Sequence, residues 1–163
     1  MKNLKVLAMA SAAVLMSAPA FAADANSTAG ADIIAPLQVA NTAPLYFGTI
    51  APSTTASDTV LVSAAGAKTC GTNLTCLTND HTAAGFDVTG EADQSYTITL
   101  PSTVAISNGS GGSMNVNNFS GSKDSGTLTA GTDNFTVGGT LTVAANQASG
   151  EYTGTFAVTV EYQ

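Results

Sequence analysis

The chain has 163 residues, and its four lysines, eleven acidic residues and absence of arginine give a net charge of −7. Proteins bind phosphate backbones and anionic membrane surfaces through clustered lysine and arginine, so this composition argues against nucleic-acid binding and against electrostatic membrane attachment. Only 9% of the residues are charged, while threonine, serine, alanine, glycine and asparagine dominate. This composition is typical of an exported β-protein with many polar turns.

The first 22 residues have the pattern of a secretory signal peptide. Lys2 and Lys5 form a positively charged start, residues 6–16 are apolar, and Ala20-Phe21-Ala22 is a small-x-small cleavage site. The apolar run is shorter than the about 20 residues that a membrane span needs. Cleavage after Ala22 leaves 141 residues with a net charge of −9. We therefore expect a protein that is exported through the periplasm and has no membrane insertion.

A mature chain of this length corresponds to one domain, and strand signals follow one another along it. Residues 23–39 alternate between small or apolar odd positions and mostly polar even positions, and Pro36 within them favours the edge of a sheet. A turn is expected at residues 41–44. Further strands are expected at residues 45–50, 59–63, 84–89, 95–100, 104–107, 114–119 (with a change of register before Phe119), 127–129 and 135–143.

Residues 135–143 form either a hairpin at Gly138-Gly139 or one strand with a glycine bulge. We favour the bulge, because the apolar positions continue on both sides of the two glycines.

The C-terminal segment Gly150–Gln163 has the most regular pattern in the chain. Its large apolar residues occupy even positions only, and polar residues fill most of the odd ones, which is the period of a half-buried strand. The apolar members are Tyr152, Phe156, Val158, Val160 and Tyr162. Together, about eight short strands separated by turns predict an all-β fold, a single antiparallel β-sandwich.

The two cysteines, Cys70 and Cys76, lie in a polar, glycine-containing stretch. An oxidising compartment favours a disulfide between them. The closed loop is short, so its stabilisation should fall below the roughly 3 kcal/mol expected for a 15-residue loop. Two cysteines and one nearby histidine do not complete a zinc site.

No group of residues has the spacing of a catalytic site. His81 is the only histidine and has no nucleophile motif to serve, so we expect it to be an ordinary loop residue. Asp87, Glu91 and Asp93 lack the dense spacing of a calcium loop. We therefore expect no enzyme, no catalytic residue, no cofactor and no metal site. A hydrolase using these three distributed carboxylates is the remote alternative.

The C-terminal pattern resembles the signature of pilus subunits of the chaperone–usher pathway. Tyr162 is the penultimate residue, Val160, Val158 and Phe156 alternate before it, and Gly150 is fourteenth from the end. Leu45-Tyr-Phe-Gly-Thr-Ile50 and the set Gly150, Tyr152, Gly154 and Thr155 are similar to the archaic, spore-coat-U-like type. The mature chain also resembles an uncharacterised bacterial secreted domain family.

The resemblance implies an immunoglobulin-like sandwich that lacks one strand and receives it from another subunit by donor-strand exchange. It assigns residues 40–163 to the sandwich and residues 23–39 to an N-terminal donor extension. The acceptor strand would contain Gly150, Tyr152, Phe156, Val158, Val160 and Tyr162. The donor would contain Ala29, Ala31, Ile33, Ala35, Leu37 and Val39.

The implied function is that of a structural subunit of a surface pilus or fimbria that contributes to adhesion or biofilm. Its partners would be other copies in a head-to-tail fibre, a periplasmic chaperone and an outer-membrane usher. The local pairing of Cys70 with Cys76 and the alanine-rich start of the donor depart from the family pattern. The alternative is a self-complete secreted sandwich that binds carbohydrate or matrix. The sequence leaves open whether Ile33, Leu37 and Val39 pack in their own domain or in a neighbouring copy.

Overall fold

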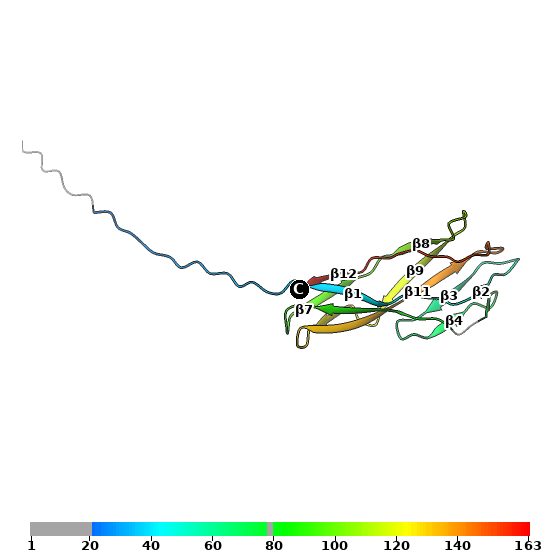
Figure 1. Ribbon diagram of the computed structural model, residues 1–163, viewed down its shortest axis with the longest axis horizontal. Coiled ribbons are helices and arrows are strands. Elements are labelled where there is room, and N and C mark those ends of the chain that lie inside the picture. Colours follow the sequence, from blue (N-terminus) through cyan, green and yellow to red (C-terminus); the bar gives the residue numbers. More distant parts are fainter. Residues whose placement is uncertain (1–20, 78–79) are drawn as a thin grey trace, which may run out of the picture. The chain divides into compact units, whose positions relative to one another are not determined.

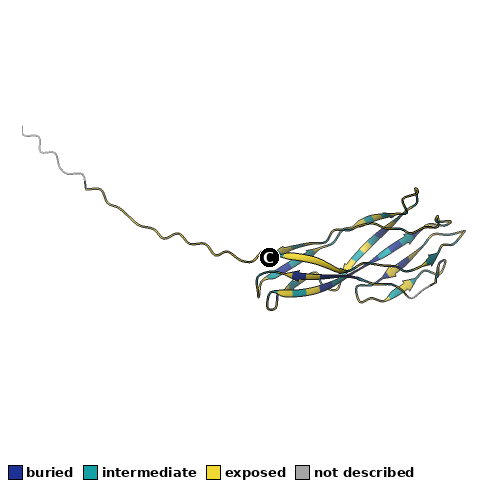
Figure 2. Cartoon of the chain, in the orientation of Figure 1, coloured by how far each residue is buried: buried dark blue, intermediate teal, exposed yellow. Residues whose placement is uncertain are grey.

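The computed structural model describes residues 21–77 and 80–163 (Figure 1). Residues 1–20, most of the expected signal peptide, lie outside this part. The chain divides into two units, Met1–Asp32 and Ile33–Gln163. Within the first unit, residues 21–32 form neither helix nor strand, and every one is exposed (Figure 2). The described part contains no helix long and apolar enough to cross a membrane.

In the second unit, all the regular structure that is described is β-strand. The strands are β1 (Gln38–Ala43), β2 (Ile50–Ala51), β3 (Asp58–Val62), β4 (Lys68–Cys70), β5 (Thr75–Cys76), β6 (Ala84–Thr89), β7 (Ser95–Thr99), β8 (Thr103–Ser107), β9 (Ser113–Gly121), β10 (Ser125–Thr127), β11 (Thr132–Val143) and β12 (Thr159–Tyr162).

The largest sheet is built on β11, the longest strand. One part of β11 pairs with β6, the following part pairs with β3, and β9 pairs with β11 over residues 137–142. β1 extends this sheet beyond β6, β4 extends it beyond β3, and β8 extends it beyond β9. All of these pairings are antiparallel. β11 therefore joins both halves of the domain within one sheet.

A second sheet of three strands has the order β10-β7-β12, and β2 and β5 form a separate pair. In an immunoglobulin sandwich one sheet contains strands A, B, E and D, and the other contains C, F and G. Here β1, β6, β11 and β9 take the places of A, B, E and D, while β7 and β12 take those of C and F. The predicted all-β antiparallel sandwich is confirmed.

Two groups of buried side chains form the core, and Figure 2 colours the buried positions along the strands. Cluster 1 lies around β3 and the second half of β11, and its buried members are Phe47, Val60, Val62, Leu74, Val116, Leu141 and Val143. Cluster 2 lies around β6, β7 and the first half of β11, and its buried members are Ala84, Phe86, Val88, Tyr96, Leu128, Phe135 and Val137. Burying side chains of this size contributes about 1.5–3 kcal/mol each, so the two clusters supply most of the driving force for folding.

Two predicted irregularities are confirmed. β11 is one strand, and its register against β9 shifts between Gly138 and Thr140. On β9 the shift falls at Asn118, whose φ of 49° is left-handed, directly before Phe119. The predicted strand at residues 84–89 coincides with β6.

The interpretation of residues 41–50 was wrong. The expected turn at 41–44 is mostly part of β1, and the expected strand at 45–50 has only a single bridge at Tyr46 besides the start of β2. Asn41 explains the difference, because its Nδ2 donates to the carbonyl oxygens of Ala43, at 2.8 Å, and Gly85, at 3.0 Å. These bonds hold the chain against β6 across a register shift.

A polar network ties cluster 2 to the surface. The hydroxyl of the fully buried Tyr96 donates to Oδ2 of Asp133 at 2.9 Å, and Lys123 Nζ donates to both carboxylate oxygens at 2.8 and 2.9 Å. Burial alone would raise the pKa of Asp133, but the bonds from Lys123, the Asn134 amide and Tyr96 outweigh it and lower this pKa. Burial, followed by the contact with Asp133, raises the pKa of Tyr96.

We expect Asp133→Asn to lower the free energy of unfolding by about 1–3 kcal/mol at pH 7, because it removes a charged acceptor of hydrogen bonds. The folded-state pKa of Asp133 is lowered, so its contribution is fully present above the unfolded-state pKa of about 3.9 and is lost as the pH falls further. Urea unfolding of both proteins at pH 7 and below pH 4 measures this, and the difference should shrink in acid. The matched control is Asp124→Asn on the exposed Asp124. Equal effects of the two substitutions would contradict the assignment.

Candidate functional site

The C-terminal segment keeps the predicted alternation but pairs over a shorter stretch than expected. The apolar even positions are half-buried, whereas odd positions from 153 to 161 are exposed. Only Thr159–Tyr162 form a strand, β12, which pairs antiparallel with β7. Upstream, Thr153 makes one bridge with Ser107 at the end of β8. The segment thus runs from the edge of the large sheet to the edge of the small one.

Between these two anchors, residues 154–158 lack backbone partners. No backbone–backbone hydrogen bond from this stretch reaches any other part of the described chain. Likewise, no strand within residues 21–77 or 80–163 pairs with the outer edge of β12, where an immunoglobulin sandwich has strand G. Backbone N–H and C=O groups near a core are nearly always paired, so this edge has unused hydrogen-bonding capacity.

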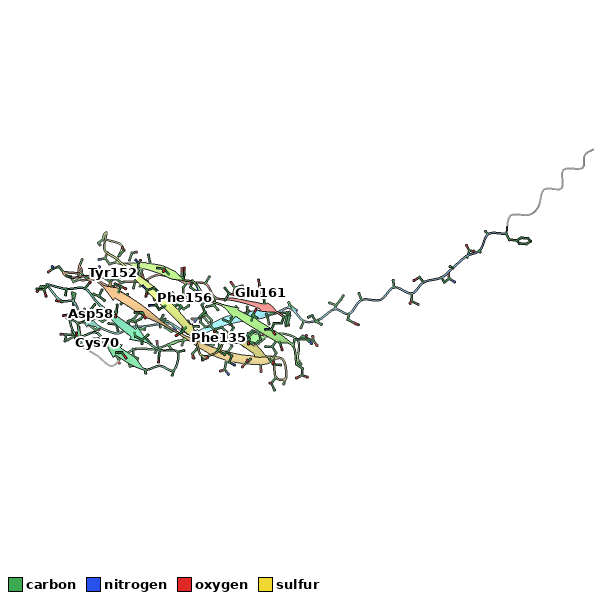
Figure 3. All side chains as sticks on the ribbon, turned by 180° about the vertical axis from the view of Figure 1, so that it is seen from behind. Asp58, Cys70, Phe135, Tyr152, Phe156 and Glu161 are labelled. Atoms are coloured by element: carbon green, nitrogen blue, oxygen red, sulfur yellow. A yellow bond between two sulfur atoms is a disulfide. The ribbon has the colours of Figure 1, made fainter. Side chains whose placement is uncertain are left out.

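The side chains of the same segment pack on the core (Figure 3). Phe156 lies edge-on to Phe86, with ring centroids 6.1 Å apart, and lies 5.0 Å from Phe119. Phe86 in turn stacks on Phe135 at 5.2 Å. Val158, Val160 and Tyr162 also contact cluster 2 while remaining partly exposed. The candidate site is therefore an open sheet edge with a half-covered apolar floor.

Gly150 and Tyr152 lie away from this floor, at the opposite end of the segment. Gly150 has a φ of 151°, which favours glycine. The Tyr152 hydroxyl donates to the Ala148 carbonyl oxygen at 2.8 Å and accepts from Gln147 Nε2 at 2.8 Å. These two residues shape the turn that leads into the segment.

The residues of the candidate donor fall into two groups. Ala29, Ala31 and Ile33 are exposed, and Ile33 is 95% exposed. Leu37 is half-buried against cluster 2, and Val39 belongs to β1, where it is 37% exposed. Hence Leu37 is the first residue of the candidate donor that packs on a core cluster, while Ile34 is 48% exposed. We call residues 23–34 the N-terminal arm.

Ala35 is held by residues far away in the sequence. Its amide donates to Glu91 Oε2 at 2.9 Å, and its carbonyl oxygen accepts from the Tyr162 hydroxyl at 2.9 Å. Sequence reasoning missed this contact, because positions 56 and 127 residues away from Ala35 carry no local signal of it.

The Cys70–Cys76 disulfide is confirmed, with Cα atoms 6.3 Å apart. Asp58 braces the same loop (Figure 3), because its Oδ2 accepts from the amide and Nδ2 of Asn73 at 2.9 and 3.1 Å. The hydrogen bonds from the Asn73 and Thr59 amides lower the pKa of Asp58. Both cysteines pack on cluster 1, so the disulfide lies apart from the open edge.

Two of the residues considered for other chemistry, His81 and Glu91, make structural contacts through their side chains, and Asp93 makes one through its backbone. His81 Nε2 lies 3.0 Å from the Gly66 carbonyl oxygen. The Glu91 carboxylate binds the Ala35 amide, and the Asp93 amide donates to the Leu128 carbonyl oxygen. Across the described ranges, no three His, Cys, Asp or Glu side chains are grouped so that they could hold a metal ion.

The model of a protein family described as "Domain of unknown function (DUF4402)" matches residues 37–162. No curated protein and no solved structure matches the chain. The matched region starts at Leu37, the first residue that packs on the core, and leaves the N-terminal arm outside.

We expect the amides of residues 154–158 to exchange with solvent deuterium at nearly the rate of an unstructured peptide, because they have no backbone acceptor. Amides of β11 should exchange only through global opening, which costs about 5–15 kcal/mol in a typical domain. Hydrogen–deuterium exchange of the monomeric protein measures both in one sample. Protection of residues 154–158 equal to that of β11 would contradict the open edge.

Proposed function

The chain belongs to the DUF4402 family, and we propose that it is a structural subunit of a surface fibre in which the open edge of each sandwich receives a strand from another copy. The proposal makes it a pilus or fimbrial protein rather than an enzyme. Its role would be mechanical and adhesive, at the cell surface or in a biofilm.

The observation that carries the proposal is the coincidence of an unpaired backbone with an unfilled apolar floor. Residues 154–158 and the outer edge of β12 offer free N–H and C=O groups. Phe156, Val158 and Val160 lie directly beside them and are only half-buried. A strand added here would gain main-chain hydrogen bonds and cover apolar surface at the same time, which is how β-strand addition works. An edge of this kind left open promotes association.

A second unpaired edge supports the same reading. β1 pairs only with β6, so its other side is free within the described part of the chain. β1 and β12 are the strands that would flank an added strand G in an immunoglobulin-like sandwich. They come together at one end, where Tyr162 contacts Ala35 just before β1. An added strand would thus lie between the free edges of β1 and β12.

The N-terminal arm has the length and pattern for this role. The acceptor edge covers residues 154–162, about 30 Å at roughly 3.3 Å per residue, and the twelve residues of the arm can span it. The arm alternates with a period of two, and all its members are exposed. Its alanines contribute about 0.8 kcal/mol each when buried, and Ile33 about 1.5–3 kcal/mol. Because Leu37 packs in its own domain and is not available for donation, we infer that main-chain hydrogen bonds provide most of the donor's affinity.

Insertion of each arm into the next copy is a heterologous contact, which propagates into an open fibre instead of a closed ring. A subunit awaiting its neighbour would expose the same edge, and a periplasmic chaperone would cover it until an outer-membrane usher delivers the subunit. The expected signal peptide fits this route of export. These partners and this location are part of the proposal.

The test compares the mature chain with a variant that lacks residues 23–33. The mature chain should form ladders that resist cold detergent and collapse on heating, because donated strands are held by many cooperative hydrogen bonds. The shortened variant should stay monomeric and should gain thermal stability when a synthetic peptide of residues 23–34 is added. If both forms are monomeric and equally stable, the proposal fails and a self-complete secreted binding module explains the sandwich.

Two adjacent isoleucines provide a matched pair of point variants. Period two places Ile33 on the inserted face of the arm and Ile34 on the opposite face. Ile33→Asp should slow polymerisation at least about tenfold, because it places a charge where insertion into the next copy would bury an apolar side chain. Ile34→Asp adds the same charge and should leave the rate within about twofold. Gel ladders and light scattering measure the rates, and equal effects would rule out insertion in this register.

A further inference from the structure

The chain segment that enters β1 is fastened where the arm ends. Three hydrogen bonds connect Ala35, Glu91 and Tyr162, and we call these three residues the latch. Glu91 Oε2 accepts from the Ala35 amide at 2.9 Å, the Tyr162 hydroxyl donates to the Ala35 carbonyl oxygen at 2.9 Å, and the Glu91 amide donates to the Tyr162 hydroxyl at 2.7 Å. Both polar groups of the Ala35 backbone are therefore used by side chains from two other segments.

The surroundings of Tyr162 leave its hydroxyl little freedom. A Cβ atom added at Gly90 would meet this hydroxyl and the methyl groups of Leu128 and Leu37. The Gly90 amide also donates to the Gly131 carbonyl oxygen at 3.0 Å, which fixes the turn that carries Glu91. Tyr162 itself is in register opposite Tyr96, a fully buried residue of β7. The latch thus lies directly beside Leu128 and Tyr96, which are buried residues of cluster 2.

We propose that Tyr162 and Glu91 are positioning residues that fix the root of the N-terminal arm next to the end of the acceptor edge. Ala35 lies at the boundary between the exposed arm and the packed domain, because Ile33 is 95% exposed, Ile34 is 48% exposed and Leu37 packs on cluster 2. Without the latch, the arm would extend as far as Leu37 and would be longer by two residues, Ala35 and Pro36.

The consequence for assembly rests on the function proposed above. Tyr162 ends the edge that accepts a donor and also holds the root of the same copy's own arm. The link between successive subunits therefore starts from a fixed point of each sandwich, and no flexible tether intervenes at that point. We infer that the latch limits bending at the joints of the fibre.

The first test uses the monomeric fraction of the mature chain and does not depend on polymerisation. Tyr162→Phe and Glu91→Ala each break the latch, and the amide of Ala35 should then exchange with deuterium about tenfold faster, the factor that corresponds to about 1.4 kcal/mol. The double variant should exchange no faster than Glu91→Ala alone, because the residues act as one unit. Tyr46→Phe removes a hydroxyl from an exposed tyrosine and is the control.

Gly90→Ala gives an independent disturbance, since the added methyl group displaces the Tyr162 hydroxyl without changing either latch side chain. It should accelerate exchange at Ala35 to a similar extent. Wild-type exchange at Ala35 as fast as at Ile33, or no acceleration in Tyr162→Phe and Glu91→Ala with unchanged melting temperatures, would overturn the latch.

The second test measures the bending of fibres by electron microscopy. Fibres of Tyr162→Phe should form but should have a persistence length at least about twofold shorter than wild-type fibres, whereas Tyr46→Phe fibres should match the wild type. Unchanged stiffness would overturn the role of the latch at the joints. If the wild-type protein forms no fibres, the proposed function fails, and the exchange experiment still decides whether the latch holds the root of the arm.

Discussion

The whole sandwich depends on the pairing of β11 with two successive strands, β6 and β3, along one of its edges. β6 pairs with it as far as Val137, and β3 takes over from Gly139. The chain leaving β3 passes so close to Gly138 that a Cβ atom there would meet the carbonyl oxygen of Val62 and the backbone of Ser63 and Ala64. Glycine at this position is therefore a steric requirement. It allows one strand to carry both core clusters, since Phe135 and Val137 lie in cluster 2 and Leu141 and Val143 in cluster 1.

The C-terminal segment has the opposite character. It also passes between two sheets, from β8 to β7, but it pairs only at its two anchors. Its side chains cover cluster 2 while its backbone groups remain unused over residues 154–158. The strands at the centre of the fold are paired on both sides, whereas unpaired backbone groups and half-exposed apolar side chains are concentrated together at this one edge. This concentration fits the added strand proposed above better than it fits a surface segment that is merely loosely packed.

Much of the fold could be predicted from the sequence, because many strands show the two-residue alternation of apolar and polar positions and glycines indicate where a strand is irregular. The alternation of Phe156, Val158 and Val160 correctly gave the buried face of the segment, and the glycine pair in β11 gave the bulge. The paired length of the last strand could not be predicted, since pairing depends on a partner that the local pattern does not contain. The local sequence around Asn41 indicates a turn, because its hydrogen bond to Gly85 spans 44 positions and leaves no local signal. The latch could not be predicted for the same reason, since its hydrogen bonds join residues 56 and 127 positions apart.

The latch also bears on how a fibre of such subunits would carry load. Pulling on the fibre would draw each arm away from Ala35. Ala35 contacts Tyr162 at the end of β12, the strand that would pair with the donated arm of the neighbouring copy. Tension would then enter and leave each sandwich through the cluster 2 half, by way of β1, β12 and the Tyr162 contact. The half containing the Cys70–Cys76 disulfide and Asp58 would lie outside the path of force. Mechanical strength would accordingly depend on shear between hydrogen-bonded strands, with the covalent crosslink contributing little to it.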